Sequence, residues 1–194
     1  MQSETPNQNP TKSIPAELGM WIFILMDLSI FALYFWVFAW GKNAHPELYA
    51  EGQANLNQIF AGLNTIALLT SSYFMATAVE AARKKDVERF TVNIKFTMSC
   101  GIIFLIIKIF EYEEKLSNGF GIVTNEFFRN YFSFTGFHLL HVIFGLGFLF
   151  YLLFGIKTKD ECENKIVQIE GIGLYWHMVD LLWVVLFSLI YLAP

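Results

Sequence analysis

The chain has 194 residues, of which 55% are hydrophobic, 18% are aromatic and only 15% are charged. Soluble domains hold roughly 45–50% apolar residues even when glycine is counted, so this composition excludes an ordinary soluble globular domain. The net charge of −4 at pH 7 gives no indication of a nucleic-acid partner.

The first part of the chain is polar. Residues 1–15 are rich in Asn, Gln, Pro and Thr and contain no apolar core of the kind a signal peptide needs. We interpret residues 1–15 as a disordered polar tail. Residues 16–194 show no internal repeat or domain boundary and are expected to form one transmembrane helical domain.

Five apolar runs follow the tail. A membrane-spanning helix needs about 20 apolar residues, because the hydrocarbon core is about 30 Å thick and each helical residue rises about 1.5 Å. The runs that reach or approach this length are residues 18–40, 59–79, 96–112, 131–156 and 171–193. None shows the alternation of a transmembrane β-strand. The pattern therefore predicts an all-α integral membrane bundle of about five transmembrane helices.

The loops between the runs differ in basic charge. Those after the second and fourth runs contain the most Lys and Arg: Arg83, Lys84, Lys85, Arg89, Lys95, Lys157, Lys159 and Lys165. Basic loops stay on the cytoplasmic side of a membrane. We therefore expect the N-terminus to be cytoplasmic and the C-terminus to lie outside.

Ionisable residues within the runs are the candidate site. An ionisable side chain in the hydrocarbon core costs about 2.5–3.5 kcal/mol on insertion scales, so such residues usually face the bundle interior and have a role. The candidates, to which Lys108 can be added, are Asp27, Glu111, His138, His141, His177 and Asp180.

Depth along the helices predicts which candidates meet. At about 1.5 Å per residue, Glu111 and His138 both lie in the outer half of their spans, so we expect them to pair. Asp27, at about 13 Å from the cytoplasmic side, is expected near His177 and Asp180. The last two are one turn apart, and a neutral imidazole can bond a carboxylate, so they can also satisfy each other within one helix.

Helical spacing places several large and small residues on the faces that carry these groups. Gly145 shares a face with His138 and His141, and its small size allows a neighbouring helix to approach. Trp176 and Trp183 share a side of the fifth run with His177 and Asp180. These residues are expected to pack helices together.

Two interpretations of the polar groups stay open. His138-x-x-His141, His177 and the carboxylates could bind zinc or iron, although the Glu-x-x-His motifs of di-iron bundles are absent. Alternatively, the groups form hydrogen bonds between helices. Asp27 is likewise either a structural group or a proton-relay group. Cys100 and Cys162 do not suggest a disulfide, since one lies in an apolar run and the other in a charged loop.

Four segments resemble motifs of one family. FSFTGFHLLHVIFGLGFL at 132–149 resembles the TGFHGxHV motif of cytochrome c oxidase subunit III, and YWHMVDLLWVVLFSLIYL at 175–192 resembles its WHFVDxxW signature. LNTIALLTSS at 63–72 and KIFEYEEKL at 108–116 resemble its LNT and EYxE segments. The motifs occur in the family's order and cover almost all of residues 18–193.

The chain departs from that family in two respects. The larger members have seven spans and form a lipid-holding cleft between the first two helices and the rest, whereas those two spans are missing here. Asp27 stands where the mitochondrial-type members have glutamate. Both features resemble quinol-oxidase subunit III and NorE, the accessory protein of nitric oxide reductase.

The resemblance implies a non-redox accessory subunit in the cytoplasmic (inner) membrane. Such a subunit supports the assembly, stability and proton uptake of a catalytic subunit I, which holds the haem and copper, and it contacts phospholipid but not nucleic acid. The chain itself then binds no cofactor and is not catalytic alone. The alternatives are an independent membrane metalloprotein and a small transporter, the latter disfavoured because the runs lack broken helices and inverted repeats.

Overall fold

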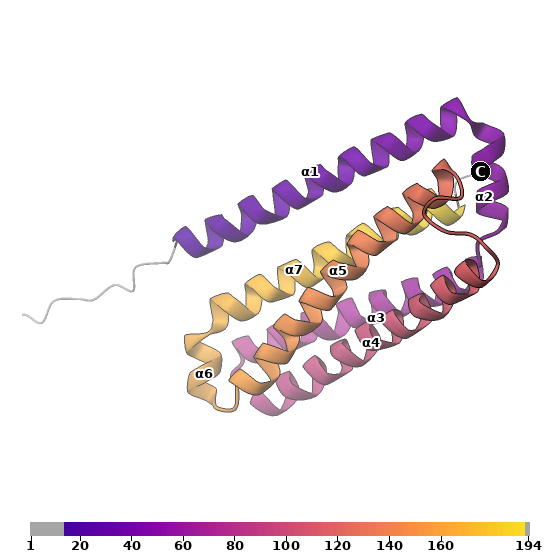
Figure 1. Ribbon diagram of the computed structural model, residues 1–194. Coiled ribbons are helices and arrows are strands. Elements are labelled where there is room, and N and C mark those ends of the chain that lie inside the picture. The colour runs from indigo at the N-terminus through magenta and orange to yellow at the C-terminus, as the bar shows by residue number, and fades with distance from the viewer. Residues whose placement is uncertain (1–13, 193–194) are drawn as a thin grey trace, which may run out of the picture.

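The computed structural model describes residues 14–192 (Figure 1). Within this range the chain is helical, with no strand. The elements are α1 (Ile14–Ala44), α2 (Pro46–Ala54), α3 (Gln58–Arg83), α4 (Val87–Ser117), α5 (Glu126–Gly155), α6 (Lys159–Asn164), α7 (Ile166–Phe187) and the π-helical turn η1 (Ser188–Leu192). The predicted polar tail falls mostly on residues 1–13, which lie outside the described residues, and α1 already includes Ile14 and Pro15.

Five helices within the described residues are long and apolar enough to cross a membrane, namely α1, α3, α4, α5 and α7 with η1. The predicted all-α, five-span fold is therefore confirmed. Polar residues set the starts of three spans by accepting hydrogen bonds from the first helical backbone N–H groups. These caps are Asn57 for α3, Asp86 for α4 and Asn125 for α5. Because Asp86 caps α4, this helix begins well before the apolar run at 96–112.

Four spans form the body of the protein. α3 and α4 pack along each other as a hairpin, α7 packs between α3 and α5, and α4 packs against α5 (Figure 1). α1 lies outside this four-helix body and contacts α7 and α5. The polar groups of the site are distributed over these interfaces.

The two basic loops lie at the same end of the bundle. Arg83 bonds Glu170 at 2.8 Å and Lys85 bonds Glu163 at 2.6 Å, so the α3–α4 turn contacts α6 and the start of α7. This juxtaposition agrees with the prediction that both loops are on one side of the membrane.

The short helix α2, which no apolar run of the sequence indicates, covers the opposite end of the bundle. The last carbonyl groups of a helix have no partner within the helix. Here the side-chain amide of Gln53 donates to the carbonyl of Ile190 at 3.0 Å, and that of Gln58 donates to the carbonyl of Tyr191 at 3.0 Å. The α2–α3 connection thereby satisfies the C-terminal end of the fifth span.

Two tryptophans of α7 fix the packing of the body. The buried Trp176 indole lies against Gly145, where an added Cβ would be 2.7 Å from the ring. Its N–H donates to Ser71 at 2.9 Å, and the N–H of Trp183 donates to Thr65 at 3.0 Å. The structure thus places Gly145, Trp176 and Trp183 at the contacts of α7 with α5 and α3.

Replacing Gly145 tests this contact. We expect Gly145→Ala to destabilise the protein by about 1–3 kcal/mol relative to Gly147→Ala, because the new methyl group overpacks the Trp176 site. Gly147 lies on the same helix with nothing near its Cβ position, so both variants gain the same helix propensity. Thermal unfolding in detergent measures the difference. Equal midpoints for the two variants would contradict the tight α5–α7 contact.

The start of α6 has a pH-dependent cap. The Glu161 carboxylate accepts hydrogen bonds from the backbone N–H of Lys157 at 2.7 Å and of Thr158 at 2.9 Å. These bonds, first the one from Lys157, hold the pKa of Glu161 below its ordinary value. A lowered pKa in the folded state stabilises the cap above the unfolded pKa, and this stabilisation is lost as the pH falls through the folded pKa.

We therefore expect Glu161→Gln to lower the hydrogen-exchange protection of α6 at neutral pH. The difference from the unmodified chain should shrink once the pH falls below the unfolded pKa of about 4.3 and vanish below the lower folded pKa, where the glutamate is protonated in both states. Exchange measured by mass spectrometry at both pH values, corrected for intrinsic rates, checks this. A difference that persists undiminished in acid would show that the carboxylate charge is not responsible.

Candidate functional site

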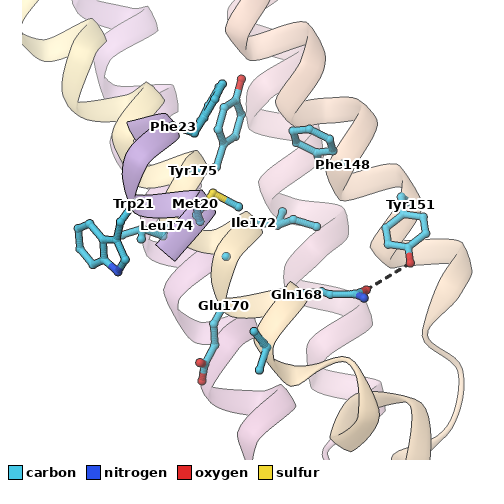
Figure 2. A pocket seen from close by; sticks show the side chains of 13 residues that line it. Met20, Trp21, Phe23, Phe148, Tyr151, Gln168, Glu170, Ile172, Leu174 and Tyr175 are labelled. Carbon is cyan, nitrogen blue, oxygen red and sulfur yellow. Dashed lines mark hydrogen bonds between the residues drawn. The ribbon is translucent and has the colours of Figure 1, made fainter. Parts of the chain in front are cut away.

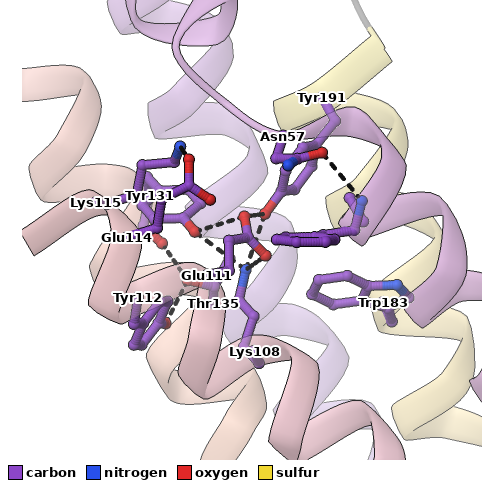
Figure 3. Close-up of polar contacts among 12 residues, drawn as sticks. Asn57, Lys108, Glu111, Tyr112, Glu114, Lys115, Tyr131, Thr135, Trp183 and Tyr191 are labelled. Atoms are coloured by element: carbon purple, nitrogen blue, oxygen red, sulfur yellow. Dashed lines mark hydrogen bonds and ion pairs between the residues drawn. The ribbon is translucent and has the colours of Figure 1, made fainter. Parts of the chain in front are cut away.

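A closed ion-pair network lies between α4, α5 and η1 (Figure 3). The Lys108 ammonium donates to the Glu111 Oε2 at 3.1 Å, to the Tyr131 hydroxyl at 3.2 Å and to the Tyr191 hydroxyl at 2.8 Å. The two hydroxyls in turn donate to the Glu111 Oε1, at 2.8 Å and 2.6 Å. The side chains of Lys108 and Glu111 are fully buried. All three ammonium donors and both carboxylate oxygens therefore have partners.

Aromatic rings enclose the ammonium group. The Lys108 Nζ lies 4.8–5.5 Å from the ring centroids of Tyr112, Tyr131, Trp183 and Tyr191. The negative face of an aromatic ring attracts a cation, and this attraction is stronger where water is excluded. The rings and hydroxyls replace the hydration that the two charges lose on burial.

The predicted pairing of Glu111 with His138 is wrong. Glu111 is instead satisfied by Lys108, which is one turn away on the same helix and has a side chain long enough to reach it. His138 is fully buried, and its imidazole lies between the Phe104 ring at 5.6 Å and the Trp183 ring at 5.3 Å. Neither of its ring nitrogens has a hydrogen-bond partner among residues 14–192.

Asp27 pairs with His141, which joins α1 to α5. The Asp27 Oδ1 lies 3.0 Å from the His141 Nε2, and the His141 Nδ1 lies 2.8 Å from the carbonyl of Phe137. The prediction that Asp27 lies by His177 and Asp180 is therefore wrong. Asp27 faces α5 because α1 packs beside α5 and α7, whereas His177 faces α3.

The partners of His141 fix how many protons this pair holds. A backbone carbonyl can only accept, so the ring nitrogen facing Phe137 carries a proton. A second proton is then needed between the other ring nitrogen and the Asp27 carboxyl for a hydrogen bond to form there. The pair is either an imidazolium with a carboxylate or a neutral imidazole with a carboxylic acid, and a proton shift of one bond converts one state into the other.

His177 and Asp180 do not satisfy each other. The His177 Nδ1 is 2.7 Å from the Ser72 hydroxyl on α3. Both carboxyl oxygens of Asp180 are buried and make no hydrogen bond within the described part of the chain. The predicted pairing of His177 with Asp180 within one helix is wrong, because the His177 imidazole instead forms a hydrogen bond with the Ser72 hydroxyl of the neighbouring helix.

No metal site forms from these groups. Within residues 14–192, no three His, Cys, Asp or Glu side chains come close enough together to hold a metal ion. The three histidines of the spans point to different neighbours, as described above. Cys100 and Cys162 are both free thiols. The metalloprotein alternative is therefore not favoured.

Two members of the ion-pair network were missed from the sequence. Tyr131 and Tyr191 stand near the ends of apolar runs. Tyrosine is common there because these positions lie at the membrane interface, so the residue type alone did not identify them as members of a buried network. A usable signal was present: a lysine and a glutamate three residues apart in one span need several further donors and acceptors from other helices.

The fold defines a class, a multi-pass helical membrane protein, in which the buried Lys108 and Glu111 neutralise each other within the bundle. The family model of cytochrome c oxidase subunit III matches residues 7–193. Subunit 3 of the cytochrome bo(3) ubiquinol oxidase of Buchnera aphidicola is 30% identical, over 90% of this chain and 84% of its own length. Cytochrome c oxidase subunit 3 of Synechocystis is 32% identical, over 90% and 74%.

A third relative is the haem-copper oxidase subunit I+III of Aeropyrum pernix, which is 30% identical over 90% of this chain and 22% of its own length. This chain belongs to the cytochrome c oxidase subunit III family.

The ion-pair network leads to a test of stability. We expect Lys108→Met to destabilise the protein by about 3–5 kcal/mol, because Glu111 is left as a buried charge without its cation. The double variant Lys108→Met/Glu111→Leu should lose less than the single variant, since no charge then remains buried. Thermal unfolding in detergent measures both.

Lys84→Met is the matched control, because Lys84 also pairs with a glutamate on its own helix, at 2.6 Å, but is exposed. We expect no measurable change for this variant. A double variant that loses as much stability as Lys108→Met, or more, would contradict the coupling of the two charges.

Proposed function

We propose that this chain is a non-redox accessory subunit of a haem-copper oxidase complex, and that a catalytic subunit I beside it holds the haem and copper. Membership of the subunit III family supports this function. The observation that supports a non-redox role is that the three histidines within the spans have separate surroundings. His141 bonds Asp27, His177 bonds Ser72, and His138 lies among aromatic rings, so they do not converge on one cofactor.

The name of one relative supports a subunit I as the partner. The Aeropyrum pernix protein is named as subunit I+III, and this chain matches about a fifth of it, at 22% of its length. That name joins a subunit I and a subunit III in one protein, which supports a subunit I as the partner of a subunit III. Some relatives are named as subunits of ubiquinol oxidases and others as subunits of cytochrome c oxidases. The identity of the partner therefore determines whether the complex takes electrons from a quinol or from cytochrome c. An association with nitric oxide reductase, like that of NorE, stays a prediction.

We further propose that the chain lies in the cytoplasmic (inner) membrane, with its N-terminus in the cytoplasm and its C-terminus outside. The basic residues of the α3–α4 turn and of the loop around α6 support this orientation. The Asp27–His141 pair then lies roughly at mid-membrane. Because it holds two protons and can shift one by a single bond, it is suited to support proton uptake by the partner.

Purification of the tagged chain from its own membranes tests this function. We expect a haem-containing subunit to co-purify, and the isolated chain to show no Soret absorbance. Peptide mass spectrometry of the partner distinguishes a cytochrome c oxidase, a quinol oxidase and a nitric oxide reductase. Stoichiometric haem, iron or copper on the lone chain would overturn the proposal.

The same complex tests the role of Asp27. We expect Asp27→Asn to slow turnover or hasten inactivation while assembly stays intact, because the amide cannot exchange the shared proton. Asp180→Asn is the matched control. Asp180 is also a buried aspartate within a span, but it does not pair with a histidine. Unchanged kinetics in Asp27→Asn, or the same change in both variants, would remove the proton role.

A further inference from the structure

The two halves of α1 are held to the rest of the protein by different contacts. In the half toward the α2 end, residues 31–44, aromatic side chains pack against other helices. The Tyr34 ring stacks on the Phe134 ring of α5 at 4.9 Å, and the Phe38 ring lies 5.1 Å from the Tyr49 ring of α2. Ring contacts therefore anchor this half to two neighbours.

The half toward the α6 end, residues 18–26, is separated from α5 by a groove (Figure 2). We call this half the arm. Met20 and Phe23 line the groove on the α1 side, Phe148 and Tyr151 line it on the α5 side, and α7 forms its floor. The groove has a volume of about 1070 Å³ and is lined mainly by aromatic and aliphatic side chains. The arm thus lies beside open space and has no wall of α5 packed against it.

The Asp27–His141 hydrogen bond stands at the level where the arm begins. From there toward the α6 end, the arm makes apolar contacts with α7. The Phe23 ring lies 6.1 Å from the Tyr175 ring, and Met20 packs beside Gly171. Apolar surfaces are not pressed together by the hydrophobic effect in lipid, so hydrogen bonds between helices have a larger share in setting their positions.

This hydrogen bond exists only while the pair holds two protons. One is the Nδ1 proton that faces the Phe137 carbonyl at 2.8 Å, and the other lies between the His141 Nε2 and the Asp27 Oδ1. Without the second proton, a carboxylate would face the lone pair of the Nε2. The Asp27 Oδ2 is buried and has no hydrogen-bond partner among residues 14–192, so neither oxygen would then have a donor. An ionised Asp27 is therefore unstable in this position.

Two titratable groups face the pair from its surroundings. The Tyr175 hydroxyl of α7 donates to the His141 carbonyl at 3.0 Å, so its proton is already engaged. His138, nearly one turn earlier on α5, makes no hydrogen bond through either ring nitrogen within the described part of the chain. From α1 the pair meets the Phe31 ring, 5.6 Å from the His141 imidazole. The proton shared with His141 is thus the one on which the position of Asp27 depends.

We propose that the Asp27–His141 pair is a proton-dependent latch. With two protons it holds the arm beside α5 and α7; when the second proton passes to the solvent, the arm is released and the groove widens. The closed arrangement holds one proton more than the open one, so a rise in pH favours the open one. The latch rests on the geometry of this chain alone, and its failure would leave the accessory-subunit proposal standing.

Double electron–electron resonance on the full chain in lipid nanodiscs measures the position of the arm. Cys100 and Cys162 are free thiols and are first replaced by serine. Spin labels are then attached at Ile22→Cys on the arm and Phe150→Cys on α5, both exposed positions. The matched control pair keeps Phe150→Cys and moves the other label to Leu33→Cys, an exposed position in the anchored half of α1.

We expect the distance between the labels at Ile22 and Phe150 to lengthen by several ångströms when the pH is raised from about 5.5 to about 9.5, across the range in which imidazole groups titrate. The distance between the labels at Leu33 and Phe150 should stay constant, because ring contacts do not depend on a proton. An unchanged distance for the arm, or equal lengthening in both pairs, would overturn the latch.

Two substitutions at Asp27 separate the hydrogen bond from the charge. The amide of Asp27→Asn can donate to the His141 Nε2 but cannot ionise, so the arm should stay closed at both pH values. Asp27→Leu has a similar size and forms no hydrogen bond, so the arm should be open at both. A pH-dependent arm in Asp27→Asn, or a closed arm in Asp27→Leu, would show that the pair does not control this half of α1.

Discussion

The structure depends first on the neutralisation of two charges inside the membrane. Lys108 and Glu111 are both fully buried, and an uncompensated charge at that depth would oppose insertion and folding. Their three ammonium donors and two carboxylate oxygens are satisfied only when α5 supplies Tyr131 and η1 supplies Tyr191. The network therefore holds three segments in one arrangement, and it specifies the body of the bundle more narrowly than apolar packing alone can.

α1 is attached by different means. Its principal polar contact with the body is the Asp27–His141 pair, supported by aromatic stacking toward the α2 end. From this pair toward the α6 end of the bundle, α1 and α5 diverge, and α7 forms the floor of an apolar groove between them (Figure 2). The same contact that joins α1 to the body thus also sets one end of the groove.

These contacts explain how a subunit III family member can be rich in buried polar groups and still hold no redox centre of its own, as we propose. The three histidines of the spans lie at separate contacts: His141 faces α1, His138 lies among the aromatic rings of the interior, and His177 faces α3. The Asp27–His141 hydrogen bond places a proton between a carboxyl group and an imidazole of two different helices.

The sequence by itself determined the five spans, the all-α class and the common end of the two basic loops, because these follow from the length of apolar runs and the position of charges between them. It also marked the ionisable residues that matter. It did not determine their partners. Glu111 and His138 were assigned to similar depths, but depth along a helix says nothing of its rotation, and Lys108 could reach Glu111 from the same helix. Only the tertiary structure brought Tyr191 to that pair, turned Asp27 toward His141, and separated α1 from α5 to leave a groove, because each depends on how helices far apart in sequence are rotated and tilted against one another.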